Sequence, residues 1–153
     1  MKYRILLVLL FTFVLSTCGS VPTPISPAEA PPTEPVEAPS VEDQASFVTA
    51  LETSGATVET SEPVTQPFFS PEGSLIKVNS ADVQVFEYET PEAMENEASQ
   101  VAPDGGSVGT TMVSWMDTPH FYKAGRIIVL YVGGDQAILD LLESALGPQF
   151  AGG

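Results

Sequence analysis

His120 is the only histidine, and imidazole is the side chain best suited to acid–base chemistry near neutral pH. A hydrolase would need it beside a nucleophile such as Ser107 or Ser114, with a carboxylate to orient the ring. Neither serine lies in a strand–turn–helix elbow, and the pattern G-x-S-x-G is absent. The sequence therefore predicts a loop or strand-edge histidine with local hydrogen bonds. A hydrolase that uses His120 is the less favoured alternative.

Metal and cofactor chemistry has little support in the residue types. A transition metal needs several His, Cys or carboxylate ligands, and the chain has one His and one Cys. Glutamates are frequent in residues 87–97, but no D-x-D-x-D-G calcium loop is present, so we expect a solvated acidic helix face. The glycine-rich residues 103–109 lack the lysine of a phosphate-binding loop. We expect no catalytic residue, metal or cofactor.

Aromatic side chains gather in two parts of the sequence. One pair lies in a proline-bounded loop, and the other aromatics surround Pro119. Aromatic rings offer large contact areas with polar edges, which suits recognition surfaces, although rings also fill small cores. Both interpretations stay open at this point. The candidate binding face consists of Phe68, Phe69, Trp115, His120, Phe121 and Tyr122.

The elements that must position these side chains follow from hydrophobic periodicity and from turn residues. An apolar stripe from Ser40 to Gly55 predicts a helix, with Ser40 as its cap. Two further helices are expected after Thr90 and Asp135. Consecutive strands without crossover helices favour an α+β fold: a mainly antiparallel sheet of about five strands with helices on one face, in the order α-β-β-β-α-β-β-α. The strands are expected at residues 56–60, 74–78, 82–88, 109–116 and 126–132.

The N-terminal residues have the composition of an export signal. Two basic residues precede an apolar run of 11 residues, 5–15, which is shorter than the ~20 residues of a membrane-spanning helix. Leu15-Ser16-Thr17-Cys18 follows and resembles the lipobox of bacterial lipoproteins, with threonine where Gly, Ala or Ser is usual. The resemblance implies that residues 1–17 are a signal peptide, cut between Thr17 and Cys18, and that Cys18 receives acyl chains. It also implies an exported protein anchored to the cell membrane or outer membrane.

Residues 18–39 are predicted to be a disordered tether. Proline recurs and no aromatic residue occurs, so this segment cannot bury enough apolar surface to offset its conformational entropy. The globular domain is then expected at residues 40–153. Without residues 1–17 the chain would have three basic residues against 20 acidic ones, a net charge of −17. Such a charge excludes nucleic acid as a partner and leaves acylation as the link to the membrane.

The folded part also resembles small uncharacterised α+β domains of bacterial lipoproteins. The segments that carry this resemblance are QPFFS, DVQVFEY, GTTMVSW, PHFYKAGRIIVLYVG and LLESALGPQFAG, within residues 47–153. No activity comes with the resemblance. We expect a non-catalytic binding or interaction module at the cell envelope, with an envelope protein or a small ligand as its partner. A structural or envelope-assembly accessory is the main alternative.

Overall fold

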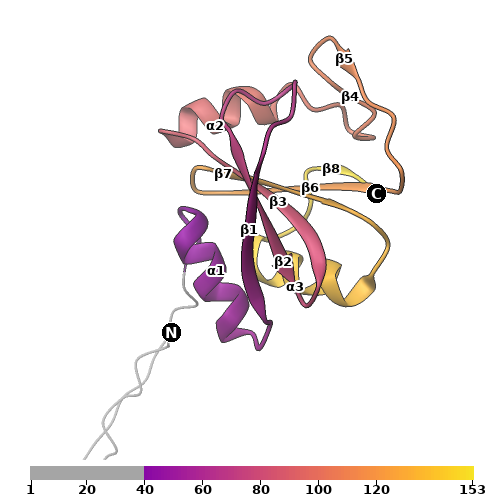
Figure 1. Ribbon diagram of the computed structural model, residues 1–153. Coiled ribbons are helices and arrows are strands. Elements are labelled where there is room, and N and C mark those ends of the chain that lie inside the picture. The colour runs from indigo at the N-terminus through magenta and orange to yellow at the C-terminus, as the bar shows by residue number, and fades with distance from the viewer. Residues whose placement is uncertain (1–39) are drawn as a thin grey trace, which may run out of the picture. The chain divides into compact units, whose positions relative to one another are not determined.

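The computed structural model describes residues 40–153 (Figure 1). The expected signal peptide, the cleavage site at Thr17 and Cys18, and the tether lie outside the described residues. The elements are α1 (Gln44–Thr53), β1 (Val58–Val64), β2 (Gly73–Val78), β3 (Ala81–Glu87), α2 (Pro91–Ala98), β4 (Ser107–Val108), β5 (Thr111–Met112), β6 (Pro119–Ala124), β7 (Ile127–Val132), α3 (Gln136–Leu146) and β8 (Ala151–Gly152).

Six strands form one antiparallel sheet in the order β1-β2-β3-β7-β6-β8, and β4 pairs with β5 in a separate two-stranded sheet. β7 lies inside this sheet, and its first five residues are buried. β2 and β3 meet in the predicted hairpin, where Asn79 and Ser80 adopt positive φ angles of 49° and 76°. The predicted α+β fold with a mainly antiparallel sheet is confirmed, with six strands in the main sheet in place of about five.

Helices cover both faces of the sheet, which corrects the prediction that they share one face. α1 and α3 pack on one face, where Phe47 and Leu142 meet strand residues such as Val85. α2 packs on the other face, where Met94 joins Phe86. Figure 1 shows α2 across the strands from α1 and α3. The central strands therefore have apolar residues at successive positions, because both of their faces are covered.

Helix caps set the ends of the three helices. Asp43, not Ser40, caps α1: its carboxylate accepts from the Ser46 amide at 2.9 Å, and the Ser46 hydroxyl accepts from the Asp43 amide at 3.0 Å. This reciprocal pair is a capping box, which starts the helix later than predicted. The predicted caps Thr90 and Asp135 are confirmed for α2 and α3.

Two strand predictions were wrong in the region that matters most for the site. Residues 109–116 were expected to form one strand, but only Thr111–Met112 is a strand, paired with Ser107–Val108. β6 was not predicted, although it pairs with β7 along its whole length, from Pro119↔Val132 to Ala124↔Ile127. Proline is compatible with the first position of a strand, so Pro119 begins β6 without losing a ladder hydrogen bond.

Candidate functional site

Six aromatic rings gather on the sheet face that α2 covers, and we call them the aromatic cluster. The centroid distances between neighbouring rings range from 4.8 Å, for Phe69 and Phe86, to 6.4 Å, for Phe69 and Phe121. Most pairs are T-shaped or tilted, the arrangements that ring quadrupoles favour. The cluster consists of Phe68, Phe69, Phe86, Trp115, Phe121 and Phe150.

Trp115, Phe68 and Phe150 are the half-buried members of the aromatic cluster. The Trp115 ring lies 6.0 Å from Phe68 and 5.9 Å from Phe121, and its Nε1 donates to the Gly105 carbonyl at 2.7 Å. Gly105 has a φ of 67°, and a Cβ there would approach Pro119 and Phe121 at 3.0 and 3.1 Å. The turn at Gly105 thus permits the close packing that fixes the indole.

Glu97 of α2 holds the loop that carries Phe68 and Phe69. Its Oε2 accepts from the Tyr88 hydroxyl at 2.8 Å and from the Ser70 amide at 3.1 Å. Burial raises the pKa of the Tyr88 hydroxyl, and the carboxylate of Glu97 raises it further. Tyr88 therefore stays a neutral donor. The Glu97 carboxylate joins α2 to Tyr88, directly after β3, and to the loop that carries Phe68 and Phe69.

His120 and Tyr122 do not join the aromatic cluster, because alternate residues of a strand point to opposite faces. Phe121 faces α2, whereas Tyr122 belongs to the core beneath α1 and α3. Burial raises the pKa of Tyr122, and Glu143 and Asp140 of α3 raise it further. Of the six residues of the expected binding face, the structure brings together Phe68, Phe69, Trp115 and Phe121.

His120 lies in β6, which pairs with β7 and β8, and its side chain bonds to Gln149, 29 residues away; the prediction of a loop or strand-edge histidine with local hydrogen bonds was therefore wrong. His120 is 7% exposed, its ring stacks on Tyr131 at 6.1 Å, and its Nδ1 lies 2.7 Å from Gln149 Oε1. The described hydrogen bonds do not connect it to Ser107 or Ser114. A nucleophile–histidine pair of the kind that a hydrolase needs is therefore not formed in this geometry.

Two methionines in the segment around Trp115 are the large exposed apolar side chains of residues 40–153, and we call them the methionine patch. Met112 is 88% exposed and Met116 is 102% exposed. Met112 ends β5, and Met116 follows Trp115 in the connection to β6. Sequence reasoning missed them because it placed both in one strand, where half of the side chains would face the core.

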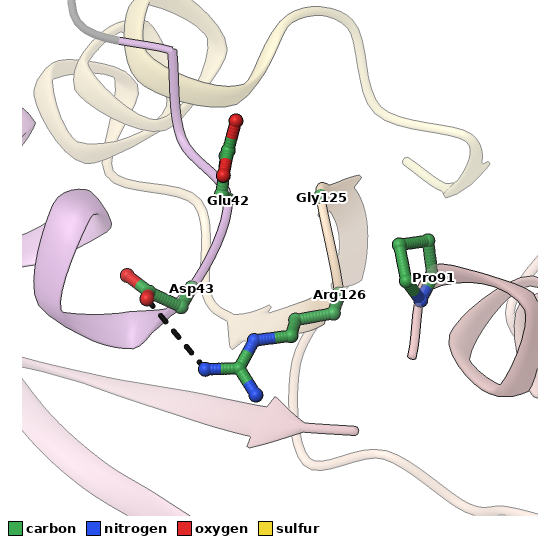
Figure 2. Close-up of a pocket in the computed structure, with 5 residues that line it drawn as sticks. All are labelled: Glu42, Asp43, Pro91, Gly125 and Arg126. Carbon is green, nitrogen blue, oxygen red and sulfur yellow. Dashed lines mark ion pairs between the residues drawn. The ribbon is translucent and has the colours of Figure 1, made fainter. Parts of the chain in front are cut away.

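A surface hollow of about 550 Å³ lies where α1 begins, and Arg126 lines it with Glu42, Asp43, Pro91 and Gly125 (Figure 2). The guanidinium points toward Asp43, with Nη2 3.6 Å from its carboxylate.

Glu87 completes the charge balance of Arg126. Its Oε1 lies 2.6 Å from Nη2, and its Oε2 accepts from the Gln44 amide at 3.0 Å. Two carboxylates already compensate the Arg126 cation, so the hollow offers no free positive charge to an anion. The interactions of Arg126 and Glu87 instead hold the start of α1 against the sheet.

Two kinds of feature are not found within residues 40–153. These residues contain no group of three or more His, Cys, Asp or Glu side chains placed to hold a metal ion. No helix in this part of the chain has both the length and the apolar character needed to cross a bilayer.

Comparisons of the chain with protein-family models, with curated proteins and with solved structures found no match.

Proposed function

We propose that this protein is a lipid-anchored, extracytoplasmic binding module without catalytic activity of its own. The methionine patch is the observation that carries the proposal. Met112 and Met116 hold thioether side chains in water, where each costs free energy that contact with a partner would recover. Two large exposed apolar side chains within the short segment 112–116 of an otherwise acidic domain indicate an interaction site.

The support beneath the patch favours binding without large rearrangement. Trp115 lies between the two methionines in sequence and is fixed by its bond to Gly105 and by two ring contacts. Glu97 holds the neighbouring Phe68 loop through Ser70. A surface that is already ordered loses less conformational entropy when a partner binds.

The anchoring part of the proposal rests on the sequence of residues 1–39. The apolar run, the lipobox-like Leu15-Ser16-Thr17-Cys18 and the proline-rich residues that follow support acylation at Cys18 and a tether. Two or more acyl chains hold a protein on a bilayer far more firmly than one. The folded domain would then act at the surface of the cell membrane or outer membrane.

The alternatives receive less support from the described geometry. A hydrolase that uses His120 would need a partner other than Gln149 for the imidazole. An envelope-assembly accessory would use the same methionine patch, but to hold a structural component in place. The accessory role therefore differs from the binding role in its partner and not in its surface. For the binding role, we favour an envelope protein over a small ligand as the partner.

Site-specific photo-cross-linking in cells tests the binding role. A benzophenone amino acid at position 112 or 116 should give cross-linked adducts that the same group at Glu92, exposed on α2, does not give. The methionine positions tolerate the change because their side chains contact little of the fold. No adduct from 112 or 116, or the same adducts from position 92, would count against a binding role for the patch.

A further inference from the structure

Two acidic residues are attached to the segment that carries the methionine patch, one through the chain itself and one through the hydrogen bonds of its turn. Asp117 follows Met116 directly, and Asp104 lies in the turn whose carbonyls bind Trp115 and Val113; both carboxylates are exposed. Asp104 accepts from the Gly106 amide at 2.9 Å, so its position is set by the turn. Figure 1 shows the β4–β5 hairpin projecting beyond the sheet, away from α1.

The cations of residues 40–153 are all engaged elsewhere. Lys77 lies 2.6 Å from Asp82, and Lys123 lies 2.6 Å from Glu95. Arg126 is bound to Glu87. It lies just after the C-terminal end of β6, whereas Met116 lies before the N-terminal end, and the six residues of β6 separate these ends by about 20 Å.

Asp104 and Asp117 form no ion pair within residues 40–153. These residues carry 17 acidic and three basic side chains, a net charge of −14. The rim of the patch is therefore negative, with no local cation to compensate it.

We propose that the methionine patch binds a basic amphipathic segment of a partner protein, with apolar side chains on one face and Lys or Arg beside them. This inference rests on the proposed binding role. Methionine is unbranched and polarisable, so it adapts to apolar side chains of different shapes. Lysine or arginine at the edge of the segment would pair with Asp104 and Asp117, whereas an acidic segment would be repelled by the domain.

A bilayer surface fits the same patch less well. Anionic lipid headgroups attract basic segments, but residues 40–153 have a net charge of −14 and no cation beside Met112 or Met116. A cationic protein segment satisfies the apolar and the acidic parts of this surface together.

Trp115 is the only tryptophan of the chain and directly precedes Met116, so its emission reports on binding at the patch. The full chain in a non-ionic detergent is titrated with tryptophan-free peptides of about 14 residues, the length of an average helix. One peptide combines Leu and Lys, one combines Leu and Glu, and one combines Ser and Lys. We expect a saturable change in Trp115 emission with the Leu/Lys peptide that the other two do not produce.

Two double variants separate the apolar from the electrostatic contribution. Met112→Ser with Met116→Ser should weaken Leu/Lys binding at least about tenfold, since partial burial of two methionines is worth more than ~1.4 kcal/mol. Asp104→Asn with Asp117→Asn keeps the side-chain oxygens that accept from the Gly106 and Thr118 amides. Because it removes both charges, it should lower the affinity for the Leu/Lys peptide and make that affinity less sensitive to salt. Both variants should fold, because the changed side chains are exposed. The methionine variant, titrated in the same detergent, also shows how much of the change in Trp115 emission comes from peptide that enters the micelles.

The outcomes distinguish this inference from the binding role itself. Equal binding of Leu/Lys and Leu/Glu peptides, or no response to either while cross-links still form at position 112 or 116, would overturn the cationic partner and leave the binding role standing. A larger Trp115 response to vesicles of anionic and zwitterionic lipid than to any peptide would overturn it in favour of a membrane surface. Absence of both peptide binding and cross-links would overturn both proposals.

Discussion

Met112 and Met116 differ from Met94 in solvent exposure, and this difference can be measured by chemical oxidation. Met94 is 5% exposed in the core beneath α2, whereas the two patch methionines are almost fully exposed. Hydrogen peroxide should therefore convert Met112 and Met116 to sulfoxides before Met94 reacts, because oxidation of a thioether follows its accessibility. Peptide mass spectrometry over a time course measures the three rates in one sample. Equal rates at the three positions would show that the patch is not exposed in solution.

Asp43 gives a second prediction at this scale, on the pH dependence of stability. The Ser46 amide lowers the pKa of the Asp43 carboxyl below its usual 3.8, and the Ser46 hydroxyl and Arg126 lower it further. A lowered folded-state pKa means that the carboxylate stabilises the fold above its unfolded pKa and that this contribution is lost as the pH falls through the folded pKa.

Asp43→Asn keeps an acceptor for Ser46 but has no charge to lose. The difference in unfolding free energy between wild type and Asp43→Asn should therefore be largest near neutral pH, begin to shrink near pH 3.8 and reach its minimum below the lowered folded-state pKa. Urea unfolding curves at several pH values measure it. A difference that is constant from neutral to strongly acidic solution would contradict a stabilising charge at Asp43.

At the level of elements, the clamp formed by Glu97 predicts a stability effect with a clear cause. Glu97→Ala removes the acceptor of the Tyr88 hydroxyl, and Tyr88 is 5% exposed. A buried hydroxyl without a partner costs about 1–3 kcal/mol, so the free energy of unfolding should fall by about that amount. Urea unfolding followed by Trp115 emission measures it.

Glu52→Ala serves as the charge-matched control for this prediction. Glu52 is exposed on α1, and its substitution should change stability by less than about 0.5 kcal/mol. If the two variants are equally stable, Glu97 does not hold the aromatic loop.

Gly152 predicts how β8 docks against β6. It has a φ of 86°, and a Cβ at this position would collide with the Pro119 carbonyl. Gly152→Ala should therefore destabilise the domain by at least about 1–3 kcal/mol, the cost of a strained backbone. Gly134→Ala is the matched control, since nothing lies within 4 Å of a Cβ there. The two melting temperatures give the comparison, and equal values would mean that β8 is not docked in this way.

The elements also show what sequence reasoning could and could not reach. α3 was predictable because its apolar residues recur with helical spacing between Asp135 and Gly147. β6 was missed because His120 and Lys123 interrupt its apolar pattern, and both are accommodated by tertiary contacts: Gln149 binds the imidazole, and Glu95 and Phe150 face the ammonium group. The pattern of apolar and polar residues along the sequence cannot predict these tertiary contacts, so it does not indicate a strand here.

The same limit applies to the candidate site. The sequence already suggested Phe68, Phe69, Trp115 and Phe121 as parts of one face, and the structure shows their rings in contact. It adds Phe86 and Phe150, whose contacts with these rings depend on strand pairing and not on sequence proximity. The methionine patch was out of reach, because exposure of an apolar side chain in a strand-like segment depends on where that strand ends. Here β5 ends at Met112.

For the whole molecule, net charge limits which partners the surface can bind. Residues 40–153 have a net charge of −14, which disfavours nucleic acid and anionic headgroups as partners. The charge alone would not keep this domain at a membrane. The proposal that it acts at the cell envelope therefore depends on acylation of Cys18.

Intact-mass spectrometry of the full chain isolated from cell membranes, beside a Cys18→Ser variant, tests that dependence most directly. We expect an amino terminus at Cys18 with the added mass of acyl chains, and a variant that lacks this mass and leaves the membrane fraction. An uncut chain with a free Cys18 thiol, or cleavage elsewhere without added mass, would contradict the lipid-anchored module.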